Sequence, residues 1–173
     1  ISWLGVAAVA TIPLLLEFDE LSFTDAYFET ISGLSTTGAT VISGLDQLPY
    51  SINLWRHALH WLGGMGIIVL AVAILPLLGV GGSQLFKAET PGPMKDQKLT
   101  PRIAETARGL WTVYFAIAIA CFLSMRAAGM GWADAFMHMC STMGLGGFSS
   151  HDASMGHFQS AAIESVAIVF MLI

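Results

Sequence analysis

Charged residues are scarce in this 173-residue sequence: Asp, Glu, Lys and Arg make up 11% of it, whereas 55% is hydrophobic. That balance argues against a water-soluble domain. Basic residues are the scarcer charge, seven against twelve acidic ones, and they form no dense run, so nucleic-acid binding is excluded. The only cysteines, Cys121 and Cys140, lie in neither a CxxC motif nor a pattern with histidine. We therefore expect neither a disulfide framework nor a zinc site built on them.

Long uncharged stretches are abundant instead. A bilayer core requires about 20 apolar helical residues, so the uncharged stretches 61–86 and 109–125 are candidate complete spans. The stretches 1–16 and 165–173 are candidate partial spans, cut by the two ends of the sequence. The first stretch has no cationic leader or cleavage site, which disfavours a signal peptide. We expect a piece of a longer membrane protein, truncated at both ends.

Two shorter helical patterns, 23–34 and 132–143, lie between these spans and are too short to cross a membrane. Asp25 and Asp134 stand near their starts, where a carboxylate meets the positive end of a helix dipole; Thr24 and Gly131 precede them as candidate caps. Glycine and small polar residues follow each helix, over 35–40 and 144–149, and should end it. The pattern predicts two re-entrant helices, each followed by an irregular segment.

The basic residues predict the orientation. Five of the seven fall between the second and third spans, so we expect the loop 87–108 to be cytoplasmic. Acidic residues gather around the two short helices, so both helices and the segments after them should face the periplasm. The five basic residues are Lys87, Lys95, Lys98, Arg102 and Arg108.

An internal repeat appears at an offset of 109 residues, which aligns Asp25 with Asp134, Ser32 with Ser141 and Gly38 with Gly147, among others. Each unit reads as span, short helix, loop and span, and the two units have the same orientation. The predicted units are 1–86 and 109–173, joined by the linker 87–108. Within them we expect outer helices at about 1–16 and 109–128, pore helices at about 23–34 and 132–143, filters at 35–40 and 144–149, and inner helices at about 52–80 and 160–173.

The segments after the short helices suit a cation filter built from backbone carbonyl groups. Such a filter needs extended backbone with no bulky side chain at its tightest points, and the negative ends of the preceding helices favour a cation there. A single glycine-rich turn would be weak evidence. Two such turns at matched positions are much stronger evidence.

Other conspicuous residues have more ordinary interpretations. We expect glycines in the second span to allow close helix packing, and Pro76 to kink or end that span. His57 and His60 should form interfacial hydrogen bonds, Arg56 should extend to the outer surface, and three tryptophans should anchor at the membrane interfaces. The glycines are Gly63, Gly64, Gly66, Gly79, Gly81 and Gly82, and the tryptophans are Trp55, Trp61 and Trp132.

Four stretches carry a resemblance to a known family: ISGLSTTGATVISGL at 31–45, WLGGMGIIVLAVAILPLLGVGG at 61–82, AETPGPMKDQKLTPRIAETA at 88–107 and GGFSSHDASMG at 146–156. In these the chain resembles the membrane subunits of bacterial Trk-type potassium uptake systems, the TrkH/TrkG group of the Trk/Ktr/HKT superfamily. The resemblance runs nearly from end to end.

The resemblance implies an all-α, potassium-channel-like membrane protein with four repeats around one pore, of which this chain holds the first and the front of the second. It implies a homodimer in the inner membrane and a cytoplasmic, TrkA-like regulatory subunit that binds the nucleotide, near the loop 87–108. This chain would bind no cofactor, and potassium would be its substrate. The implied carbonyl donors to potassium are Thr36, Thr37, Leu145 and Gly146, and the implied filter glycines are Gly38 and Gly147.

The function hypothesis is potassium uptake, without enzymatic activity. One alternative is sodium conduction or potassium–sodium symport, against which glycine rather than serine at position 38 argues mildly. Another is a membrane metalloenzyme, for which the five histidines would have to converge. A purely structural subunit would tolerate replacement of Gly38 and Gly147. The histidines are His57, His60, His138, His151 and His157.

Overall fold

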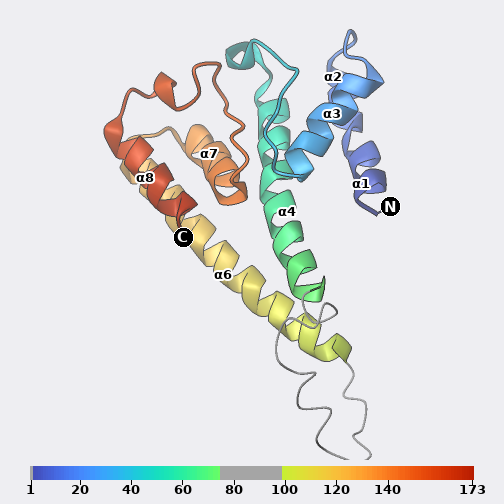
Figure 1. Cartoon of the computed structure of the whole chain (residues 1–173). Helices are drawn as coiled ribbons and strands as arrows, with labels where there is room; N and C mark the ends of the chain where they lie inside the picture. Colours follow the sequence, from blue (N-terminus) through green and yellow to red (C-terminus); the bar gives the residue numbers. More distant parts are fainter. Residues whose placement is uncertain (1, 75–98) are drawn as a thin grey trace, which may run out of the picture.

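The computed structural model describes residues 2–74 and 99–173, and within them it contains helices and no strands (Figure 1). The all-α prediction is therefore confirmed for this part of the chain. The helices are α1 Ser2–Ala10, α2 Ile12–Glu17, α3 Phe23–Leu34, α4 Tyr50–Ile74, α6 Leu99–Ala127, α7 Trp132–Gly144 and α8 Ala161–Met171, and the 3₁₀ turns are η1 Leu45–Gln47 and η2 Ser154–His157.

The helices form two similar units (Figure 1). In the view of the figure, α1 and α6 rise toward the loops while α4 and α8 descend from them, so the units have the same orientation. Helix α4 packs against α3 of its own unit and against α7 of the other. The inner helix of the first unit thereby holds both short helices.

The short helix α3 has the bounds 23–34 that the sequence predicts. Its cap is Ser22 rather than Thr24: the Ser22 hydroxyl accepts a hydrogen bond from the Asp25 amide at 3.1 Å. Asp25 lies in the first turn, as expected. The buried face carries Ala26, Glu29, Thr30 and Gly33, a spacing of three to four residues that turns one side toward α4.

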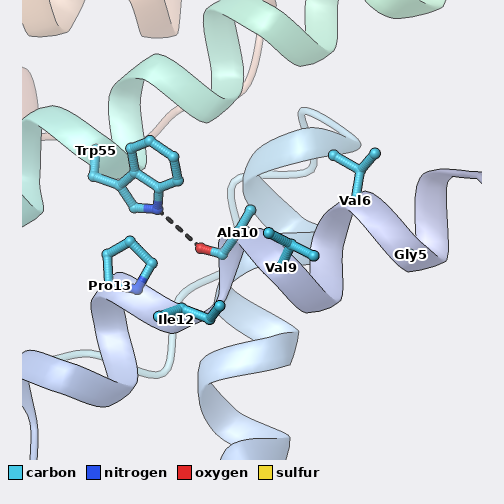
Figure 2. A pocket seen from close by; sticks show the side chains of 7 residues that line it. All are labelled: Gly5, Val6, Val9, Ala10, Ile12, Pro13 and Trp55. Carbon is cyan, nitrogen blue, oxygen red and sulfur yellow. Dashed lines mark hydrogen bonds between the residues drawn. The ribbon is translucent and has the colours of Figure 1, made fainter.

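The first outer helix is broken, which the prediction of one helix over 1–16 missed. Pro13 has no amide hydrogen and lies in the first turn of α2, so the helix cannot continue from α1 without interruption. The Ala10 carbonyl instead accepts a hydrogen bond from the Trp55 indole nitrogen at 3.0 Å (Figure 2). Trp55 therefore contacts the break from α4, and together with Val9, Ile12 and Pro13 it lines a shallow apolar groove.

The third predicted span is longer than expected at its start. Helix α6 begins at Leu99, whereas the sequence predicted a linker up to residue 108 and a helix from about 109. Its part Glu105–Ala127 has the length and mean hydropathy, 1.7, of a membrane-crossing helix, and it is the one helix among the described residues that meets both criteria. The rest of the linker, with Pro76, Gly79, Gly81, Gly82 and the end of the inner helix 52–80, lies outside the described residues.

Glycines on α4 allow close helix packing, as predicted. A Cβ on Gly63 would lie 2.1 Å from the Leu34 carbonyl oxygen at the end of α3. A Cβ on Gly64 would lie 3.1 Å from the Cα of Gly144, which ends α7. Adjacent glycines on one inner helix thus admit the ends of both short helices. This packing positions the two segments that follow them.

Candidate ion filter

The two predicted filter segments share one backbone turn. Thr36 and Leu145, each the first left-handed residue after its short helix, have φ of 55° and 53°. Gly38 and Gly147, two residues further on, have φ of 75° and 89°. Residues other than glycine rarely adopt positive φ angles, yet two of these four positions, Thr36 and Leu145, are not glycine. The same strained turn therefore occurs at both positions of the internal repeat.

The hydrogen bonds of the two turns also correspond. The Thr36 amide donates to the Gly33 carbonyl and the Leu145 amide to the Thr142 carbonyl, each at 3.1 Å. The next amides donate to the carbonyls of Ser32 and Ser141, at 2.9 and 3.1 Å. These bonds use carbonyl groups at the helix ends that have no partner within the helix. The residues that donate second are Thr37 and Gly146.

The structure brings the two segments together. A Cβ built on Gly38 would lie 1.6 Å from the Gly146 carbonyl oxygen, so the backbones are in direct contact. A Cβ on Gly146 would lie 2.3 to 2.6 Å from the ring atoms of His60 on α4. The residues that the resemblance implied as carbonyl donors therefore belong to adjoining segments. Their role in binding an ion remains a prediction.

A buried ion pair supports the first segment. Glu29 on α3 accepts a hydrogen bond from Arg56 Nε on α4 at 2.7 Å, and both side chains are fully buried. The Glu29 carboxylate also accepts from the Thr40 hydroxyl at 2.9 Å and from the Val41 amide at 3.0 Å. The ion pair thus fixes the chain just after Gly38 and Ala39 to the short helix before them.

Arg56 does not extend to the outer surface, as the sequence had suggested. Its guanidinium lies 4.3 Å from the centre of the Phe148 ring, and it donates to Asn53 Oδ1 at 3.0 Å. A charge at this depth requires a partner, and Glu29 provides it. Arg56 therefore contacts both filter segments, because the Thr40 hydroxyl of the first segment also accepts a hydrogen bond from it at 3.1 Å.

The second segment is held by a corresponding side-chain contact that involves no Arg–carboxylate pair. His138 occupies the repeat position of Glu29, and its Nε2 lies 3.2 Å from the hydroxyl of Ser149, which occupies the position of Thr40. The Ser141 hydroxyl accepts from the Gly147 amide at 3.1 Å. In both units a buried polar side chain of the short helix therefore binds the residue two positions after the filter glycine.

The two carboxylates at the short-helix starts are in place but have different partners. Asp25 accepts from the Ser22 hydroxyl at 2.7 Å, which is a local contact at the helix start. Asp134 accepts from the Ser150 hydroxyl, also at 2.7 Å, and so binds the chain after the second filter. Both carboxylates lie in the first turn of their helices, where the dipole stabilises them.

The loops after the filters join the two units. The Leu45 amide donates to Asp152 Oδ1 at 3.0 Å, and Asn53 Nδ2 donates to the carbonyls of Leu45 and Ser150 at 3.2 and 3.3 Å. His151 Nδ1 lies 2.5 Å from Asp46 Oδ1. This contact, the largest cause, lowers the pKa of Asp46 below its ordinary value.

The five histidines do not converge on one point. His60 stacks on Phe148 with ring centres 4.1 Å apart, while His57 and His138 lie 6.1 Å apart. His151 and His157 form a separate stack on the loop after the second filter, with ring centres 3.5 Å apart. The arrangement required by the metalloenzyme hypothesis is therefore not found.

The buried ion pair of Glu29 and Arg56 was not predicted from the sequence. A signal was present, because Glu29 is the one charged residue inside the predicted short helix after its first turn and falls on its apolar face. A buried carboxylate there requires a cation, and Arg56 is the nearest basic residue in the sequence.

Comparison with known proteins identifies the family. The family model TrkH, described as a cation transport protein, matches residues 1–173. The chain belongs to this family, which confirms the resemblance seen in the four sequence stretches.

Individual relatives and a solved structure agree with this. The chain is 56% identical to the Trk system potassium uptake protein TrkH of Halomonas elongata and 53% identical to that of Escherichia coli strain K12, over 99% of this chain and 36% of each relative. The crystal structure of the potassium transporter TrkH from Vibrio parahaemolyticus matches with a TM-score of 0.82 and 48% identity, over 98% of this chain and 33% of that one. The fold is thus that of a potassium-channel-like membrane protein, and the chain spans about a third of the length of these relatives.

Proposed function

We propose that this chain forms two of four filter-bearing units of a potassium uptake protein in the bacterial inner membrane. Potassium passes along a path lined by the backbone carbonyl groups of Thr36, Thr37, Leu145 and Gly146. The remaining units lie in the rest of the polypeptide. The inward current is driven by the membrane potential, which contributes about 2.3 kcal/mol per charge per 100 mV.

One observation carries the proposal: two adjoining segments adopt the same left-handed turn, and Gly38 of one contacts the carbonyl of Gly146 in the other. Two unrelated flexible turns would not be expected to share the same backbone angles and to contact each other. Carbonyl groups in such a turn can replace the hydration shell of a cation. The names of the relatives, Trk system potassium uptake proteins, favour potassium as that cation.

Glycine at position 38 favours potassium over sodium as the conducted ion. The approach of Gly146 to Gly38 leaves no space for a side chain there, so the contact requires glycine. Sodium conduction and potassium–sodium symport remain the alternatives that flux measurements distinguish. Since the relatives are transporters by name, an enzymatic activity has no support.

The proposed topology places the loops after α3 and α7 in the periplasm and the segment before α6 in the cytoplasm. Arg102 and Arg108 in the first part of α6 are on the cytoplasmic side in this topology. A TrkA-like nucleotide-binding subunit would bind on that side, and a second copy of the protein would pack in the membrane. The word system in the relatives' names is consistent with more than one component.

The proposal is tested with the full-length protein that carries this chain, produced in a bacterium that lacks its own potassium uptake systems. We expect the wild type to restore growth at low potassium and to take up rubidium, and Gly147→Ser to lose uptake or admit sodium. Gly156→Ser is the matched control, because it lies in the same loop with an ordinary φ and no atom within 4 Å of its Cβ. Full uptake by Gly147→Ser would support a purely structural role.

A further inference from the structure

We propose that Asp46, His151 and His157 bind a transition-metal dication of the zinc class at the mouth of the filter. The site joins the loops that follow the two filter segments. Its effect on potassium flux rests on the proposed function, but its existence does not.

The donor set suits such an ion. Each of the three residues offers one ligand atom, and these atoms lie within 4.8 Å of one another. Two imidazole nitrogens and one carboxylate oxygen are a ligand set that zinc accepts, with water in the fourth position. The side chains of Asp46 and His151 are 46% and 19% exposed, so the ion can enter from solvent. This exposure separates the site from the buried histidines around Phe148.

His151 is oriented as a metal-binding histidine. Its Nδ1 lies 2.5 Å from Asp46 Oδ1, and its Nε2 lies 3.3 Å from Asp134 Oδ1. A carboxylate beside one ring nitrogen keeps the proton there and leaves the lone pair on the other. The Asp134 carboxylate favours a proton on Nε2 by its charge, although the two groups form no hydrogen bond in this structure, and Nδ1 would then face the ion. An ion bound by Nδ1 and Asp46 Oδ1 would replace the direct contact between these two atoms.

His157 supplies the third ligand after a side-chain rotation. Its ring lies parallel to that of His151, with an angle of 1° between the planes. Because lone pairs lie in the ring planes, both rings cannot face one ion in this orientation. His157 is exposed, and within the described part of the chain its ring forms no hydrogen bond, so rotation about its side-chain torsions breaks none.

Metal binding would reinforce an existing link and oppose cation flow. The Leu45 amide already donates a hydrogen bond to Asp152; Leu45 precedes Asp46 in the chain and Asp152 follows His151. A dication at this point adds a second connection between the units. It also places positive charge near the path of the potassium ion, which raises the energy of an approaching cation. We therefore expect zinc to inhibit uptake.

Binding is tested by titrating zinc chloride into the purified full-length protein in a calorimeter after chelator treatment. We expect the wild type to bind zinc at this site. The affinity for zinc should be at least about tenfold weaker in His157→Gln and in Asp46→Asn. Asp19→Asn is the control, an exposed carboxylate in the loop between α2 and α3, and should bind zinc as the wild type does. Equal affinity in wild type, H157Q and D46N overturns the proposal. If D46N does not fold, the zinc affinity of H157Q alone tests the proposal.

Flux provides the second readout. Zinc in the external solution should inhibit rubidium uptake by vesicles that contain the wild type, and H157Q should resist this inhibition while keeping normal uptake without zinc. Equal inhibition of both proteins overturns the inhibitory role. Absence of rubidium uptake by the wild type without zinc would contradict the proposed function instead, and the calorimetric result would still decide whether the site exists.

Discussion

Gly38 lies against the carbonyl oxygen of Gly146, so close that a Cβ on Gly38 would be 1.6 Å from that oxygen. One filter segment therefore sets the position of the other. Gly38→Ala should abolish rubidium uptake by the full-length protein, because the new methyl group displaces the Gly146 backbone and is strained at φ 75°.

Gly129→Ala is a control that introduces strain at a positive φ without displacing a neighbouring segment. Gly129 has φ of 107° but no atom within 4 Å of a Cβ, and it lies outside both filters. We expect it to lose some stability and to keep its uptake. If both variants transport rubidium normally, close contact between the segments is not required for conduction.

The Glu29–Arg56 ion pair should contribute strongly to the stability of the fold. Removing one partner leaves a buried, uncompensated charge, which costs about 3–5 kcal/mol. Glu29→Gln and Arg56→Met should each lower the melting temperature in detergent sharply, and the double variant should lose less than the sum of the two. Additive losses would show that the pair is not coupled.

Asn53 connects the units through its amide group, which donates to Leu45 and Ser150 carbonyls and accepts from Arg56. Asn53→Leu should leave these groups without partners at a cost of about 1–3 kcal/mol each. The melting temperature of the purified protein measures this. Gln47→Leu, on an exposed residue of η1, is the control and should melt near the wild type.

Gly63 should not tolerate any side chain, because its Cβ would meet the Leu34 carbonyl oxygen at 2.1 Å. Gly63→Ala should destabilise the protein by about 1–3 kcal/mol through overpacking. Gly109→Ala on α6 has open space around it and should be neutral or stabilising, since alanine favours helix. Equal melting temperatures for the two variants would contradict the packing of α3 on α4.

Much of this architecture could be predicted from sequence where local signals agree. The helix 23–34 has a carboxylate in its first turn and one glycine, Gly33, near its end, and its bounds are those predicted. The break at Thr11 was missed because one proline in an apolar run does not say whether a helix bends or stops, and the Trp55 contact that stabilises the break is distant in sequence. The start of α6 was misplaced because its first turns are charged and resemble a linker.

In the candidate site, too, some features could be predicted from local sequence and others depend on contacts between distant residues. The positions of the two filters follow from local composition and from the repeat. The contact of Gly38 with Gly146 depends on how α4 packs between two short helices, which no local pattern contains. Arg56 was expected at the surface because long basic side chains commonly extend there, whereas Glu29 pairs with it in the interior.

The most direct test of the central claim is the ratio of rubidium to sodium flux in vesicles that contain the purified full-length protein under a fixed membrane potential. We predict a strong preference for rubidium in the wild type and a reduced preference in Gly38→Ser and Gly147→Ser, with Gly156→Ser unchanged. Equal rubidium and sodium flux in the wild type, or unchanged selectivity in both filter variants, would contradict a potassium filter formed by these segments.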